Sequence, residues 1–543
     1  MKKNSFLKNV LVLLFSQGII KTVGIIYKLY LTNKTGYGDI GNALFSAAFQ
    51  VYTIFLTVCS IGVPNAISSL VSARFAIGES QGAYRVLKVA ITIFGTIGFI
   101  ASCSLYIFAG IISNVYLQMP ETKLVLKVLS PSVFIVAITS VLKGYFNGKQ
   151  KMNITANSLS IEQIVKTIFT IILIEVFANV SNNNTVIMVC TVGITTTGGN
   201  IISLIYVFAN YLKSRQEIWT DIITSKTLKK ERKRTIINNI FKVSFPIAVC
   251  ALIGTLNKTI DAMTIVRIAK KYLGEAEAVR QYGILSGKIE SLIIFPLSFN
   301  MAFATTLIPT ISSYNAKGEL KKARKMLKLT ILAGIIIGVP CFVVMFTFPT
   351  EILKTLFPNA SDGNIMLKYS SITIIMALIA QTINSYLQGM NKMGVQIISI
   401  GLGSVLKLIL NVILIQNEKI GIYGAIISNI VSYSFILICL ICYLIRKEKI
   451  HFEFSKFIVK PLILTDFTYI MLKFVYKINI ISSKSLKLAL TFVIGGIVYI
   501  IMIFLLNIIS KDDIKMVTNG RHNTWKPWKI RKNLKFWNKK EGF

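Results

Sequence analysis

Four residues near the start of the chain form a polar stripe inside an apolar segment: Gln17, Lys21, Gly24 and Lys28. Their spacing of i, i+4, i+7 and i+11 places them on one face of a helix. The apolar run around them, Phe6–Leu31, is long enough to span a membrane, which takes roughly 20 residues. A lysine at the centre of a lipid-facing helix costs roughly 2.5–3.5 kcal/mol. We therefore expect Lys21 to face protein or a water-filled cavity, where its ammonium group can bind an anion. Lys28 either does the same or reaches the membrane interface.

Later apolar segments also carry ionisable and amide side chains, and these extend the candidate site. Helical spacing lets Asn257 and Lys258 each reach Asp261 on their own segment. Glu162 and Lys166 are likewise one turn apart, and mutual neutralisation is the simpler interpretation of that pair. Secondary intramembrane polar residues lie in the fifth and eleventh segments: Glu162, Lys166, Lys407 and Asn411.

Lys288 resembles Lys21 in having no acid on its own side of its segment. Glu290 is two residues away and points to nearly the opposite side of the helix. We therefore predict that Lys21 and Lys288 hold the negative charge of a ligand. The predicted substrate cavity is lined by Lys21, Lys28, Asn257, Lys258, Asp261, Lys288 and Glu290.

The elements that must position these residues are membrane helices. The chain has 543 residues, 54% of them hydrophobic, and a mean hydropathy of +0.65. Apolar runs long enough to cross a bilayer recur from one end to the other, and we count fourteen. The first is too long for a secretory signal peptide, so we expect it to be retained. The sequence therefore predicts an all-α polytopic protein of the cell membrane.

The net charge of +38 is distributed by topology. Most Lys and Arg residues fall in the N-terminus, the tail and every second loop, which the positive-inside rule places in the cytoplasm together with both termini. This distribution argues against nucleic acid as a partner. The basic tail Lys511–Phe543 interleaves lysine with tryptophan, and we expect it to lie on the anionic inner leaflet.

The two halves of the chain repeat one another. Tyr145–Met152 (Y-F-N-G-K-Q-K-M) recurs as Tyr386–Met393 (Y-L-Q-G-M-N-K-M), and the same offset relates Lys166 to Lys407. Each unit has six spans, so the copies enter the membrane in the same orientation and should form two parallel lobes around a central cavity. We predict five parts: a first six-helix lobe (1–215), a basic cytoplasmic linker (216–240), a second six-helix lobe (241–450), an extra helix pair (451–510) and a basic cytoplasmic tail containing tryptophan (511–543).

The sequence carries no motif for chemistry. It contains no nucleotide-binding loop of the form G-x-x-x-x-G-K-[ST], no H-E-x-x-H and no G-x-S-x-G. The seven cysteines all lie in apolar runs and have no metal-binding spacing with the two histidines. We therefore expect no enzyme activity, metal or cofactor. Intramembrane ionisable residues around a cavity indicate transport.

Several motifs resemble one family. Tyr52–Ser72 (Y-T-I-F-L-T-V-C-S-I-G-V-P-N-A-I-S-S-L-V-S) resembles the signature after the second span in the stage V sporulation protein B and lipid II flippase group. That group belongs to the multidrug/oligosaccharidyl-lipid/polysaccharide exporter superfamily. The motifs Gly24–Lys28, Tyr282–Glu290, Lys407–Ile415 and Gly421–Ser428 are also similar to those of the group.

The resemblance implies a V-shaped pair of six-helix lobes, a cationic cavity and a groove near the last two helices for a polyprenyl tail. Lys21 and Lys288 stand where Gram-negative flippases have arginine. The implied function is translocation of a polyprenyl-pyrophosphate-linked saccharide, such as lipid II, from the inner to the outer leaflet by alternating access. A coupling ion or the membrane potential is left open as the driving force. Two alternatives are a cation-coupled multidrug exporter of the same superfamily and a non-transporting scaffold for cell-wall synthesis.

Overall fold

The computed structural model describes residues 18, 20–180, 182–224, 231–478, 484–506 and 508. All regular secondary structure in this part of the chain is helical. Gln17 and the predicted tail 511–543 lie outside the described residues. The first helix covers residues 20–33. The helices that follow it are α2 (Gly38–Ser60), α3 (Val63–Ala76), α4 (Ser80–Ile111), η1 (Ile112–Leu117), α5 (Thr122–Gly148), α6 (Met152–Val180), α7 (Thr185–Lys213), α8 (Arg215–Ile223), α9 (Lys233–Leu273), α10 (Glu275–Tyr282), η2 (Gly283–Ile289), α11 (Glu290–Ala316), α12 (Leu320–Thr347), α13 (Pro349–Leu356), α14 (Asn364–Ser370), α15 (Thr373–Gly389), α16 (Met393–Gln416), α17 (Tyr423–Arg446), η3 (Ser455–Val459), α18 (Lys460–Lys477) and α19 (Lys484–Leu505).

Eleven helical stretches of the described residues are long and apolar enough to cross a membrane. Some of them are single passes with an interruption, such as α2 with α3 and α10 with η2 and α11. The helix over residues 20–33, α6 and α18 complete the alternation, which is consistent with the fourteen predicted spans. Many large apolar side chains are exposed on these helices, including Phe99, Ile107 and Ile205, as expected where lipid covers the protein.

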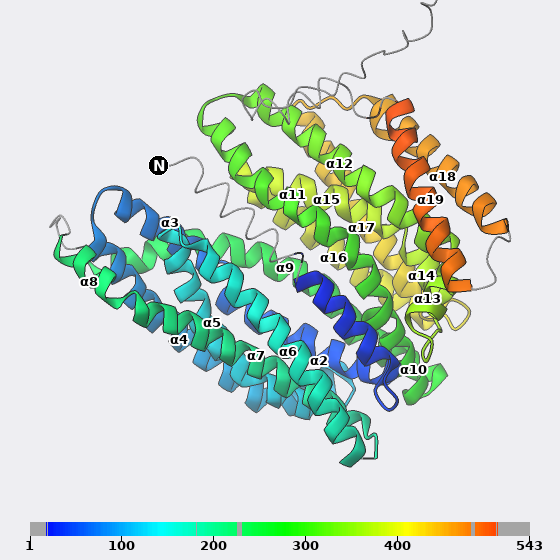
Figure 1. Cartoon of the computed structure of the whole chain (residues 1–543), viewed down its shortest axis with the longest axis horizontal. Coiled ribbons are helices and arrows are strands. Elements are labelled where there is room, and N and C mark those ends of the chain that lie inside the picture. The colour runs from blue at the N-terminus through cyan, green and yellow to red at the C-terminus, as the bar shows by residue number, and fades with distance from the viewer. Residues whose placement is uncertain are drawn as a thin grey trace, which may run out of the picture.

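The helices form two lobes that follow the sequence repeat (Figure 1). In the first lobe α5 packs against α2, α3, α4 and α7, and α6 packs against α7. In the second lobe α11 and α12 pack against α15, and α16 packs against α9 and α17. The backbone repeats as well: Gly78 and Gly318 both have positive φ at the turn before a corresponding helix, and so do Gln150 and Asn391. The predicted all-α, two-lobed fold is thus confirmed, whereas the exact domain boundaries stay predictions.

Helix α9 passes from one lobe to the other. Ile236 and Ile240, near its start, belong to the apolar core of the first lobe, and Ala262 and Ile265 belong to the larger core cluster shared with the second. Its early part passes close to the start of α3. A Cβ on Gly62, the residue just before α3, would lie only 2.4 Å from the Ser244 carbonyl oxygen of α9. We call the end of the molecule that carries α8 and the loop at 317–319 the linker end.

The opposite end, formed by residues 34–37, Gly274 and 357–363, is called the far end. Figure 1 shows the two lobes close together there, around α2 and α10, and farther apart at the linker end, around α8 and α12.

The extra helices α18 and α19 pack on one another and on α12, where the Tyr499 hydroxyl donates to the Ile336 carbonyl (2.8 Å).

Candidate functional site

The polar stripe of the first helix lies between charged neighbours. Lys21 is half-buried, makes no ion pair with any described residue, and lies within electrostatic reach of the like-charged Lys258. About two turns further along the same helix, Lys28 donates to the Asn42 side-chain oxygen at 2.5 Å. Asn42 is fully buried and donates in turn to the Thr32 hydroxyl (3.0 Å). Neither lysine forms an ion pair with a described acid, but Lys28 is hydrogen-bonded to Asn42 inside the protein, whereas Lys21 has no such hydrogen bond among the described residues.

Lys288 has an acidic partner that helical spacing could not reveal. Its side chain is fully buried in η2, and its ammonium nitrogen lies 3.1 Å from an oxygen of Asp39, in the first turn of α2. It also donates to the Ala360 carbonyl (2.5 Å) and lies 5.9 Å from the centre of the Phe357 ring. An acid in the first turn of a helix is itself favoured by the helix dipole. The Asp39–Lys288 pair joins the first lobe to the second at the far end.

Two glycines let the lobes meet at this pair. A Cβ on Gly283 would lie 1.8 Å from the Asp39 carbonyl oxygen, and one on Gly287 would lie 2.5 Å from the Asn42 Cβ. Glycines four residues apart present one smooth helix face, which allows the two backbones this close approach. Asn33 extends the contact by donating to the Leu356 carbonyl (2.8 Å). The far end is thus closed by direct packing of α2 against η2.

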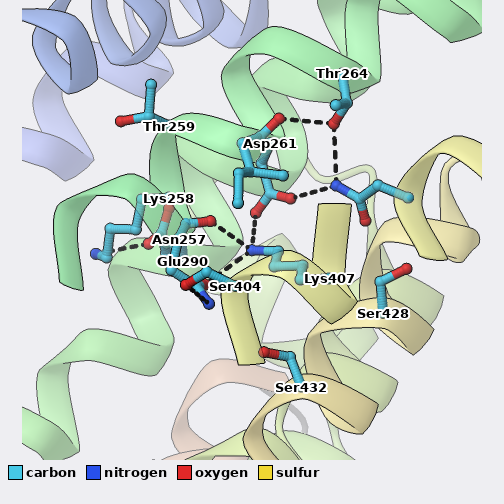
Figure 2. Close-up of polar contacts among 12 residues, drawn as sticks. Asn257, Lys258, Thr259, Asp261, Thr264, Glu290, Ser404, Lys407, Ser428 and Ser432 are labelled. Carbon is cyan, nitrogen blue, oxygen red and sulfur yellow. Dashed lines mark hydrogen bonds and ion pairs between the residues drawn. The ribbon is translucent and has the colours of Figure 1, made fainter. Parts of the chain in front are cut away.

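A second network lies inside the second lobe (Figure 2). Lys407 of α16 is 1% exposed, and its ammonium group contacts an Asp261 carboxylate oxygen at 2.6 Å and the backbone and side-chain oxygens of Asn257 at 2.9 and 3.1 Å. Asn411 donates to the other Asp261 oxygen (2.9 Å) and to the Thr264 hydroxyl (3.0 Å). The lysine and its acid are bonded on several sides, which is what a buried ion pair needs for stability.

Lys258 does not join that network. Its ammonium group is paired with Glu290 of α11 at 2.7 Å and points away from Asp261 (Figure 2). Asn257 and Asp261 therefore share a partner, as their spacing allowed, while Lys258 turns to a neighbouring helix. The structure thus brings the candidate residues of α9, α11 and α16 together as two ion pairs, Lys258–Glu290 and Asp261–Lys407.

In the first lobe, Glu162 and Lys166 do not form the ion pair that their spacing predicts. Glu162 lies 3.7 Å from Lys143 of α5, a residue that the sequence analysis did not single out. Lys166 instead lies over aromatic rings, 5.2 Å from the centre of Tyr27 and 5.6 Å from that of Phe45. Lys143 lies near the end of an apolar run, and a lysine inside such a run was the feature of the sequence that could have identified it as a candidate. The cation–π geometry explains how Lys166 is accommodated without an ion pair among the described residues.

Comparison with known proteins agrees with this architecture. The family described as "Polysaccharide biosynthesis protein" matches residues 6–315, and the family described as "MatE" matches residues 246–413. The stage V sporulation protein B of Bacillus subtilis (strain 168) is 23% identical over 95% of this chain and 98% of that protein. The lipid II flippase MurJ of the same organism is 26% identical over 79% of this chain and 80% of its own.

Solved structures share the fold. The lipid II flippase MurJ in an inward closed conformation superposes with a TM-score of 0.62 at 16% identity, covering 92% of this chain and 99% of the other. A multidrug resistance MATE family transporter in an inward-facing conformation also gives 0.62, at 14% identity and with 81% and 99% covered. Because the first family match spans more than half of the chain, the protein belongs to the polysaccharide biosynthesis protein family, within the exporter superfamily that also contains the lipid II flippases and the MATE transporters.

Proposed function

We propose that this transporter is a flippase for a polyprenyl-pyrophosphate-linked saccharide, such as lipid II or a related polysaccharide precursor. The observation that carries the proposal is Lys21, a half-buried cation within a membrane span that has no acidic partner among the described residues. An anionic head group cannot cross hydrocarbon unaided, because burying an unpaired charge is very costly. A lysine held between the lobes supplies the countercharge.

The orientation follows from charge. The basic loops gather at the linker end, so we place that end and both termini in the cytoplasm. The lobes lie apart there and meet at the far end, an arrangement that suits loading from the inner leaflet (Figure 1). The head group would meet Lys21 first, while the polyprenyl tail stays in lipid.

Lys288 can contact the substrate only after it is released from Asp39. In the closed far end it is held by Asp39 and the Ala360 carbonyl. A pyrophosphate that reaches Lys288 would compete with Asp39 for the same ammonium group. Such competition would weaken the contact that closes the far end, and would thereby link substrate binding to opening on the outer side.

The alternatives are less well supported. A cation-coupled multidrug exporter would need acids that are available to a cationic drug, but Asp261 and Glu290 are bonded to Lys407 and Lys258. A non-transporting scaffold leaves the intramembrane lysines without a use.

The test is flipping in reconstituted vesicles. A charge-assisted hydrogen bond is worth roughly 1.5–3 kcal/mol, so we expect Lys21→Gln to lower the flipping rate of lipid II or a competing polyprenyl-pyrophosphate saccharide about ten- to a hundredfold. Lys21→Arg should retain much of the activity, and Lys419→Gln, in an exposed loop, is the matched control. Removing an unpaired cation should not lower the melting temperature. Parental flipping by Lys21→Gln would show that this lysine is structural.

The extra helix pair provides a second test. We propose that α18 and α19 serve the lipid tail, since they lie outside the repeat and pack on α12. A chain truncated at Lys456 should still fold as a twelve-span core but should transport poorly. If the truncated protein flips substrate at the full rate, the pair has another role.

A further inference from the structure

A basic pocket lies at the linker end, where the second lobe meets the extra helix pair. Its volume is about 370 Å³, and α12 contributes most of its wall. The cations on that wall are Lys321, Arg324, Lys325 and Lys328, and Lys456 of η3 adds a fifth. The single carboxylate that lines it is Glu453.

The pocket is charged at its mouth and apolar below. The four α12 cations are spaced i, i+3, i+4 and i+7, which places them on one helix face, and Leu329 and Leu332 continue the lining one turn further into the span. Phe457 lines the opposite wall and packs edge-on against Phe452. Such a pocket matches a lipid that has an anionic head group and an apolar chain.

The four α12 cations are not neutralised by the part of the chain that the structure describes. None of the four α12 cations forms an ion pair with a described residue, whereas the neighbouring Lys322 is paired with Glu319 (2.9 Å). The Nε of Arg324 is buried and has no hydrogen-bond partner among the described residues. A buried donor without a partner costs free energy, so an acceptor from outside the chain would stabilise this position.

The corresponding helix face of the first repeat carries fewer cations, and those it carries have partners within the protein. Tyr84, Arg85 and Lys88 of α4 correspond to Arg324, Lys325 and Lys328. There Arg85 donates to the Glu231 carbonyl (3.4 Å), and Lys88 lies over the Tyr84 ring (4.9 Å). The two additional cations of the second repeat therefore do not follow from the duplication.

We propose that this pocket binds the phosphate head group of an anionic membrane phospholipid, with one acyl chain along Leu329 and Leu332. The site lies at the joint between α12 and η3, so an occupied pocket ties the extra helix pair to the second lobe. It is separate from the lysines between the lobes and does not depend on the proposed substrate.

The test measures binding of phosphatidylglycerol to the purified full chain in mixed detergent micelles, by native mass spectrometry. A Lys or Arg near an anionic lipid surface strengthens binding about fivefold, so Arg324→Gln with Lys328→Gln should weaken phosphatidylglycerol binding about 25-fold. Arg324→Lys keeps the charge and should bind nearly as well as the parent. Arg85→Gln with Lys88→Gln removes two charges from the equivalent face of the first repeat and should leave binding unchanged.

Three comparisons separate the sources of a phosphate. Phosphatidylcholine and inorganic phosphate should bind the parent protein far more weakly than phosphatidylglycerol, because one lacks net charge and the other lacks the chain. A polyprenyl pyrophosphate should bind the Arg324→Gln/Lys328→Gln variant as it binds the parent. Equal phosphatidylglycerol binding by parent and variant, or a variant that loses only the polyprenyl pyrophosphate, overturns the proposal. If this variant does not fold, Lys321→Gln with Lys325→Gln, both exposed, replaces it with the same expectations.

Discussion

Breaking the Asp39–Lys288 pair should open the far end of the molecule. Lys288 is fully buried and the Asp39 side chain is 8% exposed, so Lys288→Met leaves a carboxylate buried without its partner. Removing one member of a buried pair costs roughly 3–5 kcal/mol. Asp39 regains water if α2 separates from η2, so this cost falls mainly on the closed state. The ratio of open to closed molecules should then rise roughly a hundredfold to a few thousandfold.

The assay is the labelling rate of a single cysteine by a membrane-impermeant maleimide. Thr32→Cys, in a background without the seven native cysteines, places a thiol at a position that is 1% exposed in the closed far end. Labelling should be slow with the native pair and much faster with Lys288→Met. Adding Asp39→Asn should slow it again, since a neutral amide is cheaper to bury than a carboxylate.

The control for this experiment is Arg280→Met. Arg280 is paired with Asp362 (2.7 Å) at the same end, but both side chains are exposed by more than a third and both belong to the second lobe. Exposed pairs contribute about 0–1 kcal/mol, so the labelling rate should change little. A Lys288→Met rate within twofold of the parent, or no reversal by Asp39→Asn, would refute the reasoning.

Three further outcomes are expected. Lys407→Met should destabilise the protein by roughly 3–5 kcal/mol, because it leaves the Asp261 carboxylate buried without its partner, and adding Asp261→Asn should recover most of the loss. Thermal unfolding in detergent measures both effects, and equal melting temperatures for Lys407→Met and the parent would contradict this prediction. A reporter fused after Asn359 should be external, and one fused after Lys322 should be internal. Finding both reporters on the same side would contradict the predicted topology. Gly287→Ala should hinder closure of the far end, since its Cβ would lie 2.5 Å from Asn42, and should therefore accelerate labelling of the same cysteine; an unchanged rate would show that the helices adjust without separating.

The membrane fold of this protein was predictable from its sequence because insertion is a local property. About 20 consecutive apolar residues suffice to identify a span, and the neighbouring charges indicate its orientation. The repeat was visible for the same reason, since Tyr145–Met152 and Tyr386–Met393 are short matches that keep their offset. The α-helical class and the two lobes follow from these local signals, and the family was indicated by the resemblance of short motifs such as Tyr52–Ser72.

The partners of the intramembrane charges were decided by tertiary structure alone. Helical spacing identifies neighbours within one helix, but Lys288 is bonded to Asp39, 249 positions away, and Glu162 forms its ion pair with Lys143 on another helix. Such contacts depend on which helix faces pack together, and that choice is made by side-chain volumes along whole helices. The basic pocket beside Arg324 arises in the same way, because its walls come from two segments that the packing of α18 on α12 brings together.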